Sequence, residues 1–67
     1  MMRVTLLVNG ESRVVESEGP MTVNQLLERL GIMPSTVLVA AGERVIPHTT
    51  LIKSDVSLEA VIVSSGG

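Results

Sequence analysis

The stretch TVNQLLERLG at residues 22–31 carries the strongest helix signal in the chain. Thr22 is a favourable N-cap residue, and Gln25 three positions later completes a capping-box pattern. Gly31 suits the left-handed position that follows a helix C-terminus. The apolar residues of the stretch share one helical stripe: Val23, Leu26, Leu27 and Leu30. A helix of about two and a half turns is marginal alone, so the stripe is expected to pack against a sheet.

Runs of β-branched and aliphatic residues on both sides of the helix predict strands. Five are expected, at residues 3–8, 12–16, 36–41, 43–46 and 58–63. Asn9-Gly10 lies between the first two and is a strong hairpin signal, because both residues tolerate positive φ. Residues 48–55 are expected to form a loop, in which Leu51 or Ile52 anchors a single helical turn as one alternative.

The element order is β-β-α-β-β-β, and one helix covers only one face of a four- or five-stranded sheet. The first and last strands are the most apolar, so they are predicted to lie side by side at the centre and run parallel. This arrangement is an α+β fold of the β-grasp type. A ferredoxin-like βαββαβ fold is the main alternative, but it needs a second helix. The predicted core is Val4, Leu6, Val8, Val23, Leu27, Leu30, Leu38, Leu58, Ala60 and Ile62.

Composition narrows the class of function. The chain has 67 residues, which is one domain, and 45% of them are hydrophobic. It has no cysteine, so no disulfide or thiol nucleophile is available, and a cytoplasmic location is expected. The net charge of −2 is scattered and aromatic residues are absent, which argues against nucleic acid as a partner. No apolar run approaches the roughly 20 residues of a membrane span.

The last four residues, Ser64-Ser65-Gly66-Gly67, follow the final predicted strand. Glycine has no side chain, so a Gly-Gly segment is thin and takes backbone shapes closed to other residues. Such a segment fits a narrow channel and can present its carboxylate to another protein. Residues 1–63 are therefore predicted to be the folded domain, and residues 64–67 a flexible tail with few contacts to it.

Three motifs give the chain a resemblance to the sulfur-carrier branch of the ubiquitin-like proteins. This branch includes ThiS, MoaD, the ubiquitin-related modifier and the small archaeal modifier proteins. Residues 22–31 are similar to the family's TV-x-x-LL-x-x-LG helix, and GERVIPH at residues 42–48 resembles the NGE-x-VP-R stretch of the thiamin carriers. Gly66-Gly67 matches the terminal pair. The resemblance covers nearly the whole chain.

The resemblance implies a mechanism centred on Gly67. An E1-like adenylating enzyme that uses ATP would activate the Gly67 carboxylate, and a sulfur nucleophile from another protein would displace AMP to give a thiocarboxylate. Alternatively, a lysine of a target protein would attack and form an isopeptide bond. Ser64, Ser65 and Gly66 would fill the activating enzyme's channel. The chain itself would be no enzyme and bind no cofactor or metal, and the sulfur recipient stays open among the thiamin, molybdopterin and tRNA-thiolation pathways.

A partner-binding surface is predicted on the uncovered face of the sheet. Alternation in the last strand turns one set of residues away from the core. If the strand at residues 36–41 lies beside it and buries Leu38, two more valines emerge next to this set. The predicted surface is Val37, Val39, Glu59, Val61 and Val63.

A competing hypothesis is a β-grasp interaction domain without covalent chemistry, whose Gly-Gly end is incidental. His48 and Lys53 are the chain's only histidine and lysine. Solvated loop residues are the default interpretation of both. The sharper alternatives are that His48 contacts an activating enzyme and that Lys53 receives a modifier.

Overall fold

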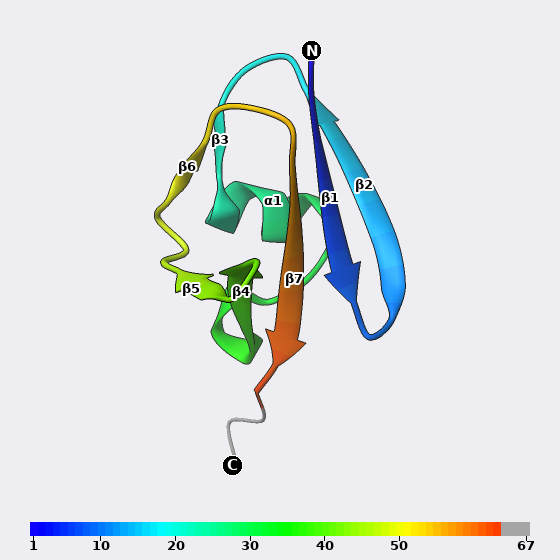
Figure 1. Ribbon diagram of the computed structural model, residues 1–67, viewed down its shortest axis with the longest axis vertical. Coiled ribbons are helices and arrows are strands. Elements are labelled where there is room, and N and C mark those ends of the chain that lie inside the picture. The colour runs from blue at the N-terminus through cyan, green and yellow to red at the C-terminus, as the bar shows by residue number, and fades with distance from the viewer. Residues whose placement is uncertain (64–67) are drawn as a thin grey trace.

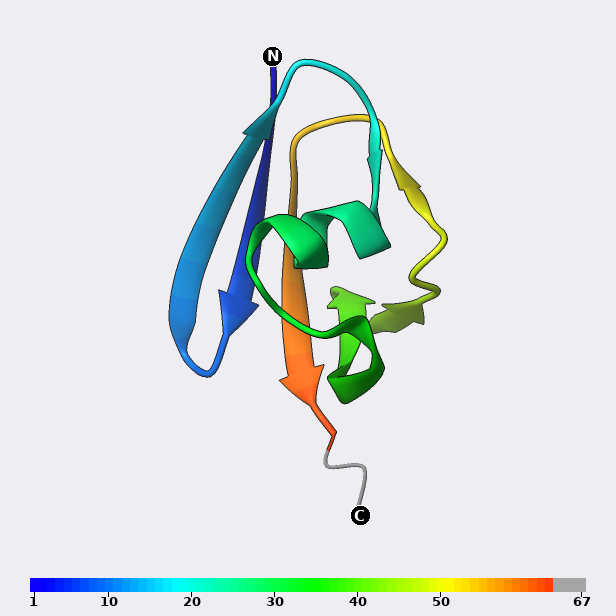
Figure 2. The same ribbon diagram turned by 180° about the vertical axis from the view of Figure 1, so that it is seen from behind.

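The computed structural model describes residues 1–63, which form a five-stranded mixed sheet with one α-helix on one face (Figures 1 and 2). The elements in chain order are β1 (Met2–Val8), β2 (Glu11–Ser17), β3 (Met21–Thr22), α1 (Val23–Arg29), a 3-10 turn η1 (Pro34–Thr36), β4 (Val37–Ala41), β5 (Arg44–Ile46), β6 (Leu51–Ile52) and β7 (Val56–Ile62). The seven residues of α1 are far too few for a helix that crosses a membrane, and no other helix of residues 1–63 is long enough.

The strands are ordered β2-β1-β7-β4-β5, so β7 is the central strand. β1 and β7 run parallel, and β7 pairs antiparallel with β4 on its other side. Asn9 and Gly10 have φ of 51° and 78°, which gives the tight turn between β1 and β2. The predicted β-grasp arrangement, with the first and last strands parallel at the centre, is confirmed.

Helix α1 begins at the predicted capping box. The Thr22 hydroxyl accepts a hydrogen bond from the Gln25 backbone N–H at 3.2 Å, and the Gln25 side chain accepts one from the Thr22 N–H at 2.9 Å. Gly31 follows the helix with φ of 72°, in the left-handed region. The helix lies across the face of β7 and β1 that is turned toward the viewer in Figure 2. It therefore covers the inner face of the sheet and leaves the opposite, outer face open.

The core lies between α1 and the inner face. Six predicted core residues are buried: Val4, Leu6, Val23, Leu27, Leu58 and Ala60. Val8 and Leu30 are partly buried against them. Leu38 and Ile62 were predicted to be buried but are 44% and 51% exposed. Buried hydrophobic residues outside the predicted set are Met2, Val15, Met21, Leu26, Val37, Val39 and Ile52, and Ser17 is buried as well.

The segment at residues 48–55 differs from the predicted loop. Instead of a helical turn, Leu51 and Ile52 form the short strand β6, which pairs with β3 through Met21 and Ile52. Ile52 is buried by this pairing, whereas Leu51 stays exposed. The helical turn was a wrong alternative, because extended backbone lets β6 pair with the residues that lead into α1.

Candidate functional site

The end of β7 fixes where the last residues of the chain begin. β7 is hydrogen-bonded on both sides, to β1 and to β4. One residue beyond it, the Val63 N–H donates to the Thr36 carbonyl oxygen at 2.8 Å. The chain is thus held to the sheet up to Val63. Gly67 and the predicted channel residues Ser64, Ser65 and Gly66 lie outside the described residues, as does the predicted flexibility of that segment.

The predicted contribution of β4 to the outer face was wrong. Val37 and Val39 are 3% and 0% exposed and point into the core, whereas Leu38 between them points outward. The register explains the reversal: Leu38 lies directly opposite Val61, and opposite residues of antiparallel strands share a face. A shift of one residue in register moves a whole strand's side chains to the other face. Leu38 takes the place that Val37 and Val39 were expected to hold beside Val61.

An exposed apolar cluster surrounds the end of β7. We call it the end patch, and it consists of Leu38, Val61, Ile62 and Val63. Val61 is 47% exposed on the outer face, where no helix covers it. Ile62 belongs to the inner face by alternation, but α1 does not cover it. A seven-residue helix is about 10 Å long and a seven-residue strand about 20 Å, so the helix leaves part of the strand open.

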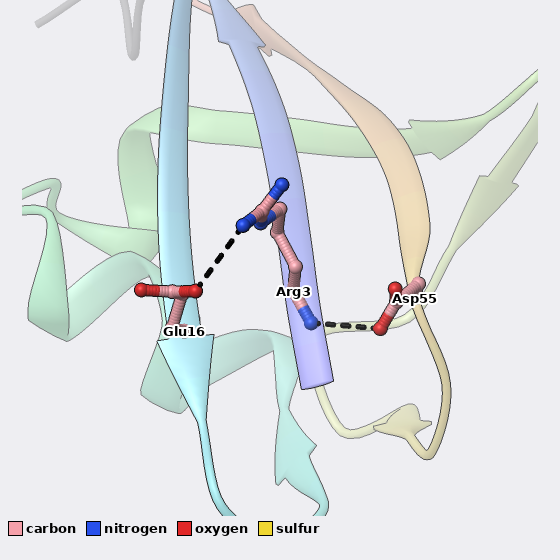
Figure 3. A network of polar contacts seen from close by, with 3 residues as sticks. All are labelled: Arg3, Glu16 and Asp55. Atoms are coloured by element: carbon pink, nitrogen blue, oxygen red, sulfur yellow. Dashed lines mark hydrogen bonds and ion pairs between the residues drawn. The ribbon is translucent and has the colours of Figure 1, made fainter. Parts of the chain in front are cut away.

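Polar residues occupy the opposite part of the outer face. Glu59 is exposed and lies between Leu7 of β1 and Ala40 of β4. Farther along, Arg3 forms an ion pair with Glu16 at 3.4 Å across β1 and β2 (Figure 3). The Arg3 backbone N–H donates to Asp55 Oδ1 at 2.8 Å. The outer face is therefore apolar where β7 ends and charged where β7 begins.

His48 has a main-chain role that its side chain did not indicate. Its carbonyl oxygen accepts from the Asn24 N–H at 3.0 Å, and the Thr50 carbonyl accepts from the Val23 N–H at 3.0 Å. These N–H groups belong to the first turn of α1, where helical partners are lacking. A turn closed by the Thr50 N–H and the Pro47 carbonyl, 3.0 Å apart, presents both acceptors. The first-turn N–H groups of every helix need hydrogen-bond acceptors, and this need was the one signal that could have indicated the role of the His48 and Thr50 carbonyl groups.

The side chains of residues 1–63 form no metal-ligating cluster and no unsatisfied buried polar group. Within that part of the chain, no three histidine or acidic side chains come together as a metal site. Cysteine is absent from the whole sequence. No buried side-chain polar atom of the described residues lacks a hydrogen-bond partner. The candidate site is therefore a surface, the end patch, from which the chain leaves the sheet.

Comparison with known proteins finds no matching family model. The sulfur carrier protein TtuB of Thermus thermophilus is 33% identical over 66 residues, which cover 98% of this chain and all of TtuB. The crystal structure of the thiamine biosynthesis protein ThiS from Geobacter metallireducens is 25% identical, with a TM-score of 0.62. That alignment covers 94% of this chain and 99% of ThiS.

Two more distant structures share the fold alone. A crystal structure of ATBAG1 in complex with HSP70 has a TM-score of 0.69 at 10% identity. A chain of the pParkin-pUb-UbcH7 complex has a TM-score of 0.67 at 15% identity. Each alignment covers 92% of this chain but only 40% and 23% of the matched chains, respectively.

Proposed function

Because the chain belongs to the ThiS/MoaD-like β-grasp sulfur-carrier proteins, we propose that its sulfur is carried on the carboxylate of Gly67. The observation that carries the proposal is the likeness to the sulfur carrier TtuB, which extends over 98% of this chain, and the chain itself ends in Gly66-Gly67. The fold is consistent with it, since the central strand β7 ends at Ile62, five positions before Gly67 in the sequence.

The proposed chemistry makes a poor electrophile into a good one. An E1-like enzyme transfers AMP from ATP to the Gly67 carboxylate and releases pyrophosphate. AMP is a far better leaving group than oxide, so a sulfur nucleophile from another protein can displace it. The carbon–oxygen bond to AMP breaks and a carbon–sulfur bond forms. When the nucleophile is a persulfide on the donor protein, a partner thiol then cleaves the sulfur–sulfur bond, which leaves a disulfide on the partner side and releases the Gly67 thiocarboxylate. If a lysine amine attacks instead, the product is an isopeptide bond.

In this proposal the chain is a substrate and not a catalyst. Its activating enzyme binds ATP and supplies the catalytic groups, and a sulfur-acceptor enzyme or a target lysine receives the product. The chain contributes the carboxylate and a surface for recognition. No cysteine is present to form a thioester on this chain, so every nucleophile for the transfer of sulfur comes from a partner.

The end patch is the proposed docking surface for the activating enzyme. Leu38 and Val61 form an exposed pair on the open face, and Val63 continues it toward Gly67. Exposed apolar clusters often mark interfaces. A partner docked there would receive the chain's last four residues without a reversal of chain direction. Val37 and Val39 are not part of this surface, because they are buried.

Val61→Asp tests the docking surface. The variant is expected to fold, because the site is exposed, and to be adenylated poorly by the cognate activating enzyme. Val14→Asp is the matched control: Val14 is also exposed and pairs with Thr5 on β1, two strands away from the end patch. Pyrophosphate release should fall for Val61→Asp and stay near the parent value for Val14→Asp. Equal release from both would exclude the end patch.

Deletion of Gly66 and Gly67 tests the proposed carrier group. The melting temperature is expected to stay nearly unchanged, while adenylation is lost. Intact mass after incubation with activating enzyme, ATP and a sulfur donor should show the parent chain gain 16 mass units, about the difference between oxygen and sulfur. A parent chain that forms neither adenylate nor thiocarboxylate would favour the competing hypothesis of a non-covalent interaction domain.

A further inference from the structure

Lys53 is the single lysine of the sequence, and the fold places it far from the end of β7. It follows β6 directly and lies in the connection at residues 53–55 that leads into β7. Figure 1 shows this connection at the end of the molecule where the N-terminus lies, while β7 finishes at the opposite end. The Lys53 side chain is exposed, and within residues 1–63 it forms no ion pair or hydrogen bond.

Lys53 also lines an open hollow of about 470 Å³. Two segments form most of its wall, the turn before β3 with Glu18, Gly19 and Pro20 and the connection with Lys53, Ser54 and Asp55. Apart from Gly19 and its two neighbours in the chain, no described residue has a heavy atom within 4 Å of the position that a Cβ on Gly19 would take. Asp55 is held in place by the Arg3 N–H (Figure 3). The amine thus borders a concave space that has room for a segment as thin as Gly-Gly.

We propose that Lys53 is the acceptor for the activated Gly67 carboxylate of a second copy of this chain. The inference rests on the proposed function, which supplies the acyl adenylate. The uncharged Lys53 amine attacks the Gly67 carbonyl carbon of the second copy, a carbon–nitrogen bond forms, and the bond to AMP breaks. The amine's proton passes to water or to the Glu18 carboxylate of the same hollow. The products are an isopeptide-linked pair of chains and AMP.

Chain length favours a second copy over closure within one molecule. The six steps from Val56 to Ile62 make β7 about 20 Å long. The five residues after Ile62 reach at most about 18 Å when fully extended. They would have to reverse direction and run back past the whole strand to approach Lys53. Linkage between copies needs no such reversal, and it leaves the acceptor's own end patch free for the activating enzyme.

The test measures activation and linkage in the same sample. Parent protein is incubated with the cognate activating enzyme and ATP, and pyrophosphate release is followed beside intact mass. A species of twice the chain mass less one water is expected. Trypsin should yield residues 45–67 with residues 54–67 attached at Lys53, because modified lysine resists cleavage. Lys53→Arg should release pyrophosphate like the parent. Its amount of the doubled species should fall to the level seen in a control sample without ATP.

A variant with its lysine at another position tests whether linkage requires the hollow or only an exposed amine. Lys53→Arg combined with Arg44→Lys keeps the net charge and moves the amine to exposed Arg44 on β5. This double variant is expected to stay unlinked. Three results would overturn the inference while the proposed function stands. They are linkage of the double variant through residue 44, linkage of the parent at any group other than Lys53, and pyrophosphate release by the parent without a doubled species. Absence of pyrophosphate release would overturn both.

Discussion

Both faces of β7 carry apolar residues, yet only the inner face is buried beneath the helix. Leu58 and Ala60 are covered by α1 on the inner face, whereas Val61 on the outer face is open. Glu59 marks the outer side of this strand, so alternation identifies both faces from the sequence. β4 has the sequence VLVAA, without any polar residue, and its faces are not distinguishable in that way. Hydrophobicity alone therefore does not distinguish the buried face of a strand from its exposed face in this fold.

The largest effect on stability is expected from a charge on the inner face. Val39→Asp places a carboxylate at a site with 0% exposure, where it has no partner. A domain of this size has a free energy of unfolding of roughly 3–10 kcal/mol, at about 0.05–0.15 kcal/mol per residue. The variant should therefore be unfolded by circular dichroism at room temperature. A folded Val39→Asp with the parent's melting temperature would contradict the assigned faces of β4.

Removal of a buried leucine should have the next largest effect. Leu27→Ala truncates a fully buried side chain of α1 and is expected to cost about 2–5 kcal/mol of unfolding free energy. The matched control is Leu38→Ala on the outer face, where the side chain is 44% exposed. Urea unfolding should place the control within about 0.5 kcal/mol of the parent. Similar losses in both variants would mean that the outer face is covered in solution.

Loss of the helix cap should cost less. Thr22→Ala removes the acceptor for the Gln25 N–H and is expected to lower the unfolding free energy by about 1 kcal/mol. Thr49→Ala, at an exposed position without a side-chain hydrogen bond among the described residues, is the control. The melting temperature should fall by several degrees for Thr22→Ala only. An unchanged melting temperature would show that the turn at residues 47–50 holds the helix start by itself.

The smallest effect is expected at the charged part of the outer face. Glu16→Gln removes the ion pair with Arg3, in which both side chains are more than half exposed (65% and 54%). Such pairs contribute about 0–1 kcal/mol and are screened by salt. Parent and variant should differ by less than 1 kcal/mol at low salt, and by less still at 1 M salt. A larger, salt-independent loss would indicate a further role for Glu16.

The sequence predicted the fold because its local signals agree with one another. The Thr22 and Gln25 capping box, the Asn9-Gly10 turn and the apolar first and last strands each act over a few residues, and no distant contact overrides them. The register of β4 is different in kind. It depends on the residue at which η1 ends and β4 begins, and on the pairing of Leu38 with Val61, which lie 23 positions apart (61 − 38).

Part of the candidate site escaped prediction for the same reason. Glu59 and Val61 were placed on the outer face correctly, because Glu59 defines the alternation of their strand, and Val63, one residue beyond that strand, is exposed. Leu38 and Ile62 were assigned to the core, since a leucine and an isoleucine at a strand end look alike whether covered or open. The main-chain role of His48 depends on carbonyl groups, which carry no sequence signature.

The central position of β7 also has a mechanical consequence. A force applied to the chain beyond Val63 acts along the axis of a strand whose hydrogen bonds to β1 and β4 lie across that axis. All of those bonds are loaded together in shear, and none can open ahead of the others as in a peeled edge strand. A force that acts on this domain through its C-terminal residues therefore loads the strand pairs of β7 in shear and does not unzip them one bond at a time.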